Sequence, residues 1–156
     1  MTVQRRTAPE PQGMLKLRLW VRLLRAVRVV EVDLRRRLRT EFGETLPRFD
    51  VMAALARQTT GMTMTEISRF LMVSNGNVTG IVDRLVSDGL VVRAQRNGDR
   101  RTSFVSLTRK GLNAFEDMAS AHEQWVDELL ARVTVREAQQ LSGKLKSFRS
   151  DWEGEV

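Results

Sequence analysis

A run of short polar residues between positions 74 and 84 carries the groups that recognise nucleic-acid bases and phosphates. Its candidate contact residues are Ser74, Asn75, Gly76, Asn77, Thr79, Gly80 and Arg84. Asparagine can hold adenine through two hydrogen bonds, threonine offers a methyl group to thymine, and arginine binds guanine or phosphate. Serine at a helix start suits a phosphate oxygen, and glycine lets a backbone approach its partner closely. Taken alone, such a face is equally typical of an ordinary solvated helix.

Arginines cluster in a second segment, at Arg96, Arg100 and Arg101. An Asn-Gly dipeptide within it separates two segments rich in β-branched residues, 90–96 and 102–107, which predicts a tight hairpin. A thin ribbon with arginine at its tip fits the minor groove, where the negative potential is enhanced over A-tracts. Asp99 would repel DNA unless paired, so we expect it to orient a neighbouring arginine. The alternative is a solvated loop with incidental charge.

Local signals place the polar run on the second of two short helices. Thr63 and Glu66 have the spacing of a capping box, and the helix that follows turns three apolar residues inward: Met64, Ile67 and Leu71. Residues 72–74 form the predicted turn. A second helix runs from about Ser74 to Ser87, ends at Gly89, and carries its own apolar face: Val78, Ile81, Val82 and Leu85.

The remaining segments are helical by periodicity. A long helix is predicted over residues 14–40, a short one begins at Pro47, and two more follow caps at Thr108 and Thr134. The order is long helix, three short helices, hairpin and two helices. This is a mainly α fold with a small β-hairpin wing, a winged helix-turn-helix. In such a fold the second helix of the pair enters the major groove while its apolar face packs on the first.

The flanking helices carry more apolar surface than a compact head can cover. Their stripes extend over residues 14–40, 112–130 and 138–152. Symmetric pairing would bury them and place two recognition helices about one DNA turn apart, so we expect a homodimer. The predicted organisation is a flexible tail, a helical dimerisation region in two parts and a DNA-binding head: 1–13, then 14–46 with 108–156, and 47–107.

Charge is concentrated in two parts of the chain. The 156 residues include 26 Lys and Arg against 19 Asp and Glu, a net charge of +7. Residues 1–40 carry +8 and residues 62–111 carry +4, whereas residues 112–156 carry −4. A basic surplus predicts a polyanionic partner, nucleic acid or an anionic membrane surface. Because part of it falls on the hairpin and the second helix of the pair, we expect double-stranded DNA.

Composition excludes several kinds of chemistry. The chain has no cysteine, no tyrosine and one histidine, His122, which is more typical of a packing or surface residue than of a ligand or base. We therefore expect neither an enzyme nor a metal site nor a cofactor. No apolar run approaches the roughly 20 residues of a membrane span, and the first thirteen residues lack a signal-peptide core. The expected location is the cytoplasm, with nucleoid association when the protein is bound to DNA.

Several motifs resemble those of the MarR-type transcriptional regulators. Asp99-Arg100-Arg101, followed by Val105-Ser106-Leu107-Thr108-x-x-Gly111, is similar to their wing, and residues 78–85 followed by Asp88-Gly89-Leu90-Val91 are similar to their recognition helix and its exit. The resemblance implies an obligate homodimer built from the first helix and the last two. It also implies two heads that read a pseudo-palindrome, usually as a repressor, with Arg100 and Arg101 in the minor groove.

The basic block of the first helix has two interpretations. It can be a solvated face with cations placed favourably near a helix C-terminus, or some of its arginines can bind an anionic effector. Regulators that resemble this chain often respond to aromatic carboxylates, and some to aromatic acyl-CoA thioesters. Arginine would bind the anion and an apolar slot the ring. The candidate effector pocket comprises Trp20, Arg22, Arg48, Phe49 and Met52.

A different class of function remains open at this stage. A ligand-independent architectural protein that binds DNA or RNA through the basic block would show weak sequence preference. Its binding would fall uniformly as the arginines of residues 35–39 are neutralised. A sequence-specific regulator would instead depend on the wing. An enzyme ranks third, because no catalytic groups cluster in the sequence.

Overall fold

The computed structural model describes residues 12–95 and 103–153, and it divides into two compact units at the boundary between Asp33 and Leu34. Helix α1 (Gln12–Phe42) extends two residues beyond the predicted helix at each end. In the first unit it carries apolar side chains that are exposed on the single chain, among them Leu17, Trp20 and Val27. The predicted wing residues Arg96, Asp99, Arg100 and Arg101 lie outside the described residues.

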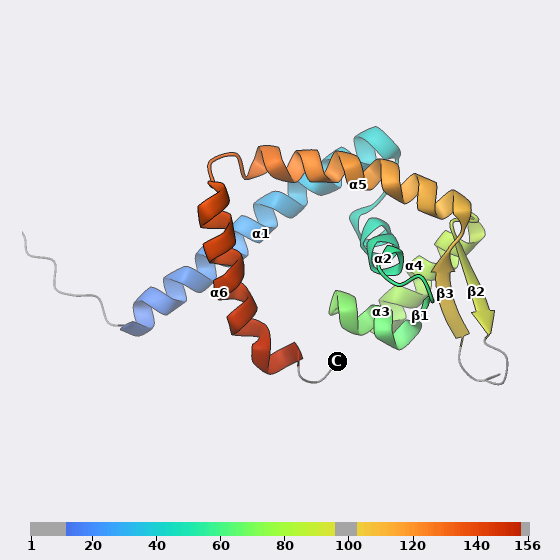
Figure 1. Ribbon diagram of the computed structural model, residues 1–156, viewed down its shortest axis with the longest axis horizontal. Coiled ribbons are helices and arrows are strands. Elements are labelled where there is room, and N and C mark those ends of the chain that lie inside the picture. The colour runs from blue at the N-terminus through green and yellow to red at the C-terminus, as the bar shows by residue number, and fades with distance from the viewer. Residues whose placement is uncertain (1–11, 96–102, 154–156) are drawn as a thin grey trace, which may run out of the picture. The chain divides into compact units, whose positions relative to one another are not determined.

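The second unit contains the rest of the elements (Figure 1). They are α2 (Leu46–Ala56), β1 (Met62–Thr63), α3 (Met64–Leu71), α4 (Asn75–Ser87), β2 (Val91–Gln95), β3 (Ser103–Leu107), α5 (Arg109–Leu129) and α6 (Val135–Glu153). The predicted mainly helical fold with a hairpin is confirmed. None of the helices in the described ranges is long and apolar enough to cross a bilayer.

The hairpin belongs to a three-stranded antiparallel sheet rather than standing alone. The strand order is β1-β3-β2, and Val105 of β3 pairs with Met62 on one side and Arg93 on the other. The two hairpin strands were predicted, but β1 was not. A strand of two residues has no alternation to detect, and its pairing with β3 ties the start of α3 to the wing.

The core lies where α2, α3, α4 and β3 meet. The largest fully buried side chains of the second unit are Leu38 of α1 together with Val51, Met52, Ile67, Val78, Val82, Leu85 and Val105. Removing an aliphatic side chain of this size from a packed core costs about 2–5 kcal/mol. The predicted inward positions of α4 are therefore largely right, although Ile81 is only half-buried.

Side-chain caps fix the starts of three helices. The Thr63 hydroxyl accepts from Glu66 N at 3.2 Å while Thr63 N donates to Glu66 Oε2 at 2.7 Å, which confirms the predicted capping box. Thr134 and Glu137 repeat this arrangement before α6, and Thr108 Oγ1 accepts from Gly111 N before α5. The Glu137 carboxylate accepts from the Thr134 hydroxyl at 2.7 Å and from Thr134 N at 2.9 Å, and these two hydrogen bonds hold its pKa below the usual range.

The turn between α3 and α4 is built on a left-handed residue. Met72 has φ 52° and ψ 41°, and its N–H donates to the carbonyls of Ser68 and Arg69. Val73 N donates to Ser68 O at 3.0 Å. A methionine in this conformation carries a steric cost that glycine would avoid, and the tight turn it forms sets the angle between the two helices of the pair.

The first turn of α5 docks on the backbone that leaves α4. Leu90 O accepts from Thr108 N at 3.0 Å, Gly89 O accepts from Thr108 Oγ1 at 2.8 Å, and Asp88 O accepts from Lys110 Nζ at 2.9 Å. A Cβ at Gly111 would lie 1.8 Å from Leu90 O. Only glycine allows this approach, since no L side chain fits so close to a carbonyl oxygen.

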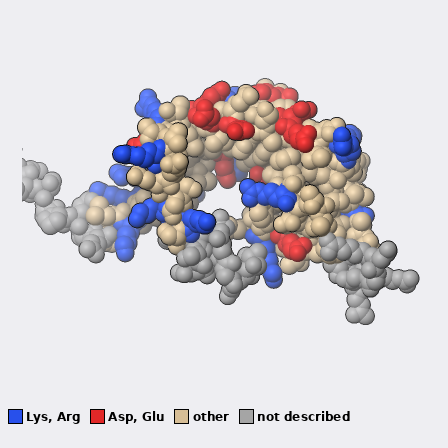
Figure 2. Space-filling view, in the orientation of Figure 1, with Lys and Arg blue, Asp and Glu red and all other residues tan. Residues whose placement is uncertain are grey.

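The far end of α5 packs on the C-terminal end of α1. Arg37 Nη1 donates to Glu128 Oε2 at 2.7 Å, and the Arg37 guanidinium lies 5.9 Å from the centre of the Trp125 ring. The Phe42 ring lies 6.1 Å from the same ring. Figure 2 shows acidic side chains gathered along α5, where Glu116, Asp117, Glu123, Asp127 and Glu128 are exposed.

His122 of α5 packs against α2 through its aromatic ring. Its ring stacks on Phe49 with centroids 4.8 Å apart, and Phe115 lies 5.6 Å from Phe49 on the same side of α2. Burial lowers the pKa of the His122 imidazole, because the charged form is disfavoured away from water. These contacts give the histidine a packing role.

Gly111→Ala is expected to destabilise the protein by at least about 1–3 kcal/mol, because the new methyl overlaps the Leu90 carbonyl and forces the backbone apart. Urea unfolding at fixed protein concentration measures the loss. Gly143→Ala on α6 is the matched control, because a Cβ there meets nothing within 4 Å. It should be neutral or stabilising, by up to about 1 kcal/mol. Equal stability of the two variants would contradict the docking argument.

Candidate nucleic-acid interface

Helix α4 has a buried face and an exposed polar face. Val78, Val82 and Leu85 are fully buried and fix the helix against the core. The predicted contact residues are all exposed: Ser74, Asn75, Gly76, Asn77, Thr79, Gly80 and Arg84. The structure therefore brings these residues together on one accessible surface, hereafter the α4 face.

The two glycines of the α4 face are not required by the protein itself. A Cβ at Gly76 or at Gly80 would meet no atom within 4 Å, and neither residue has a positive φ. Glycine inside a helix costs about 0.5–1 kcal/mol relative to alanine. Nothing within the described chain compensates for this cost, and the helix backbone is open to close approach at both positions.

The start of α4 lacks the side-chain cap that α3 and α5 have. Ser74 is the N-cap residue, but its side chain makes no cap hydrogen bond within the described residues, unlike Thr63 and Thr108. The first N–H groups of a helix lack intrahelical partners and attract anions. Thr79 Oγ1 donates to Asn75 O at 2.9 Å, which fixes its side chain on the α4 face. The exposed start of α4 is thus suited to a phosphate oxygen.

A groove of about 770 Å³ borders the α4 face beside the loop between α1 and α2. Arg84, Asn77, Ile81 and Val73 line one wall, and the other wall comprises Gly43, Glu44, Thr45, Pro47, Arg48 and Asp88. Arg48 is paired on both sides, since its Nε lies 2.6 Å from Glu44 Oε1 and its Nη2 lies 2.7 Å from Asp88 Oδ2. Among the described residues, Arg84 forms no ion pair that would hold its guanidinium away from the groove.

The five residues of the predicted effector pocket are divided between the two units. Phe49 and Met52 are buried in the core, and Arg48 lines the groove. Trp20 and Arg22 are exposed in the first unit. An apolar periodicity cannot distinguish a core position from a pocket wall, and two of the five predicted residues are core residues.

An ion pair between helix and wing was missed at the level of sequence. Arg93 Nη2 of β2 lies 2.6 Å from Asp83 Oδ1 of α4. Asp83 lies within the polar run of residues 74–84, and an acidic residue among groups suited to phosphates is a signal that sequence alone offers. No group of acidic, histidine or cysteine side chains within residues 12–95 and 103–153 could hold a metal ion.

Comparison with known proteins adds independent information. Residues 45–103 match the model of the MarR family. A solved structure of a MarR family transcriptional regulator from Silicibacter pomeroyi is similar, with 35% identity, a TM-score of 0.76, and coverage of 92% of this chain and 99% of that one.

Two curated relatives match over shorter regions. The transcriptional activatory protein BadR of Rhodopseudomonas palustris is 34% identical over 65% of this chain and 59% of its own length. The homoprotocatechuate degradative operon repressor of Escherichia coli is 32% identical over 46% of this chain and 49% of its own length. The chain thus spans about half of the length of these relatives.

Gly80→Ala should separate stability from binding. The methyl raises helix propensity, so the free energy of unfolding should rise by up to about 1 kcal/mol. The same methyl stands where a partner backbone approaches, so the DNA-binding free energy should weaken by about 1–3 kcal/mol. Thermal unfolding and fluorescence anisotropy with labelled duplex measure the two quantities. Asn113→Ala on α5 also raises helix propensity and should leave binding unchanged, whereas tight binding by Gly80→Ala would refute a close approach at this position.

Proposed function

This chain belongs to the MarR family of transcriptional regulators, and we propose that it binds a pseudo-palindromic operator as a homodimer and represses transcription until a small anionic effector releases it. Family membership places the chain among regulators rather than enzymes, as its composition predicted. The order of elements, with a helix pair followed by a sheet and two long helices, is the winged helix-turn-helix expected from sequence.

The observation that carries the DNA-binding proposal is the pair of unrequired glycines on α4. Gly76 and Gly80 leave the helix backbone open to close approach, and no atom of the described chain occupies that space. Asn75, Asn77 and Arg84 flank them with groups that bond base edges or phosphates. A solvated helix face would have no need for two glycines that weaken the helix.

The homodimer proposal is supported by apolar side chains that the single chain leaves in water. In the first unit, Leu19, Trp20 and Val27 are each more than half exposed, and on α6 Leu141 and Leu145 are about half exposed. Monomeric proteins rarely leave contiguous apolar surface of this kind uncovered. A second copy would cover these helices and set the spacing of two α4 faces on one side of DNA.

The effector proposal concerns the groove beside α4. Arg84 offers a guanidinium to a carboxylate, and Val73, Pro47 and Ile81 offer apolar surface to a ring. One relative is named for the homoprotocatechuate degradative operon, and homoprotocatechuate is an aromatic acid. We therefore propose an aromatic carboxylate or its CoA thioester as the effector. It would release the operator by binding more tightly to the conformation that does not bind DNA.

The competing proposal is an architectural protein that binds DNA or RNA through the basic first helix. The α4 face favours the sequence-specific regulator. Gly76 and Gly80 allow a partner to approach the helix backbone closely, and a protein that binds only through charge on its first helix would not need this. Repression is the direction proposed here. In vitro transcription from a promoter that contains the selected operator measures it directly, since activation would raise the transcript level.

Operator binding should depend on the wing. An operator is first selected from a random duplex library with the wild-type protein. Arg101→Ala is then expected to weaken operator binding by about 1–3 kcal/mol and binding to random DNA by much less. Arg132→Ala, beyond the end of α5, is the control and should change neither. An equal loss on both duplexes, or a library in which no sequence is enriched, would support the architectural alternative.

The effector should stabilise the protein and release the operator. Benzoate, phenylacetate, benzoyl-CoA and phenylacetyl-CoA form the test panel. A ligand present at a hundred times its Kd adds about 2.7 kcal/mol to the free energy of unfolding, which thermal shift detects. Arg84→Gln should abolish the shift, and Arg109→Gln should retain it. The effector proposal fails if no compound of the panel shifts the melting temperature.

A further inference from the structure

The ion pair between α4 and β2 lies on the surface that is proposed to meet DNA. Asp83 is the single acidic residue among the thirteen residues of α4. It follows Gly76 by seven positions and Gly80 by three, so it lies on the same side of the helix as the glycines. Its carboxylate is held by Arg93 Nη2 at 2.6 Å.

This pair is poorly explained as a stabilising contact of the fold. The side chains are 54% exposed at Asp83 and 38% exposed at Arg93. Exposed ion pairs contribute little to stability, because water screens the attraction and two side chains lose freedom. The backbone of Arg93 is already fixed by its register opposite Val105. A carboxylate at this position would repel phosphates if it were unpaired. The presence of Asp83 on this surface therefore calls for a role in binding.

We propose that Asp83 is a specificity-determining residue, which holds the Arg93 guanidinium by its ion pair and withholds that charge from the phosphates of DNA that does not match the operator. The proposal rests on the DNA-binding function proposed above. Binding to DNA of any sequence grows with the number of phosphates that cationic side chains neutralise. Sequence is read through base edges instead. When Asp83 neutralises Arg93, phosphate contacts contribute less to the binding of any duplex. The reading of base edges is left intact.

The ion pair also makes Arg93 different from Arg84, the arginine of the α4 face. Arg84 of the α4 face lines the groove and enters none of the ion pairs described above. Arg93 has a carboxylate at hydrogen-bond distance that already supplies its counter-charge. An arginine so engaged must give up that partner to bind a phosphate, and the exchange brings little net gain. Asp83 therefore limits how strongly α4 and β2 together attract an arbitrary duplex.

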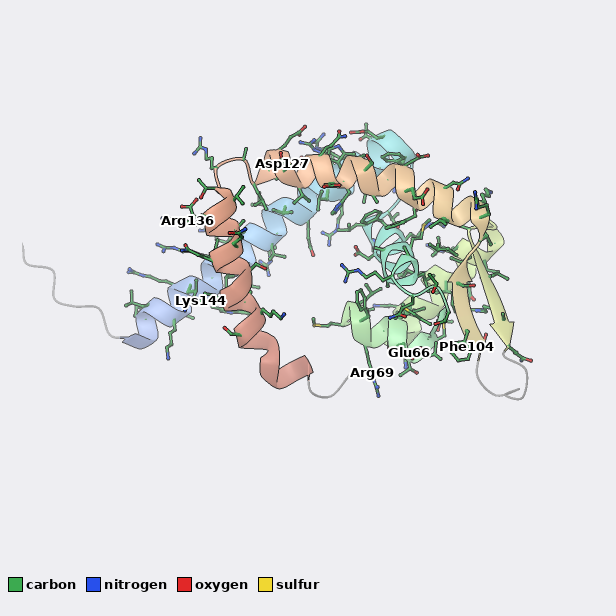
Figure 3. All side chains as sticks on the ribbon, viewed as in Figure 1. Glu66, Arg69, Phe104, Asp127, Arg136 and Lys144 are labelled. Carbon is green, nitrogen blue, oxygen red and sulfur yellow. The ribbon has the colours of Figure 1, made fainter. Side chains whose placement is uncertain are left out.

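Asp83→Asn tests the proposal directly. The amide keeps the shape of the carboxylate and removes its charge, so Arg93 becomes available to phosphates. Binding to random duplex should tighten severalfold, operator binding should change less, and the ratio of the two affinities should fall. The slope of log K against log salt should steepen by about 0.9 for each subunit on the duplex. Asp127→Asn on α5, labelled in Figure 3, removes the same charge elsewhere and should leave the affinity ratio unchanged.

A double-variant cycle distinguishes this role from a structural one. Arg93→Gln leaves Asp83 unpaired and should weaken binding to both duplexes. Combining it with Asp83→Asn removes both charges and should bring the affinity ratio back toward that of the wild type. Melting temperatures of all variants should match, since the pair is exposed. An affinity ratio that Asp83→Asn leaves unchanged, or a double variant that is no closer to the wild type, would overturn the proposal.

The outcome is separable from the fate of the proposed function. If the wild-type protein enriches no operator, the sequence-specific function itself fails. If the wild type prefers its operator and Asp83→Asn retains the full preference, only the role of Asp83 is wrong.

Discussion

The carbonyl oxygen of Leu90 is the point on which the arrangement of the head depends. It accepts the hydrogen bond from Thr108 N and lies against Gly111, so the start of α5 is fixed to the chain that leaves α4. The carbonyls of Asp88 and Gly89 add two more bonds from the same turn of α5. The helix proposed to face DNA and the helix that leads away from the head therefore share one short stretch of backbone. A change in the direction of α5 would therefore be transmitted to α4 through residues 88–90.

A second link joins α4 to the N-terminal side of the head. Asp88, which ends α4, pairs with Arg48 of α2, and Arg48 also pairs with Glu44 in the loop after α1. The C-terminal end of α4 is thus held between α2 and α5, while its first turn is held by apolar packing and the tight turn at Met72. This arrangement leaves the polar face of the helix clear and places the groove beside it, where a bound anion would meet Arg84 at the edge of the same face.

Features that depend on local chemistry could be predicted from sequence. The capping boxes of Thr63 and Thr134 and the end of α4 near Gly89 follow from spacing alone, because each cap is formed within four residues. Strand β1 could not be predicted, since its two residues become a strand only by pairing with β3 far along the chain. Phe49 and Met52 were assigned to a pocket because an apolar face has the same pattern in a core. The Asp83–Arg93 pair needed the fold, which brings a helix and a strand together.

The composition of α4 has a consequence for the dynamics of the head. Two glycines and several β-branched residues give this helix a low intrinsic propensity, so the segment 75–87 would not be helical in isolation. Its helical state is maintained by three buried side chains, Val78, Val82 and Leu85. Segments of this kind open locally at a lower free energy than the rest of a domain, and their amide protons exchange with solvent earlier. The order of the helix proposed to meet the operator is therefore sensitive to the packing of its neighbours, and contact with a duplex would slow the exchange of its first turn.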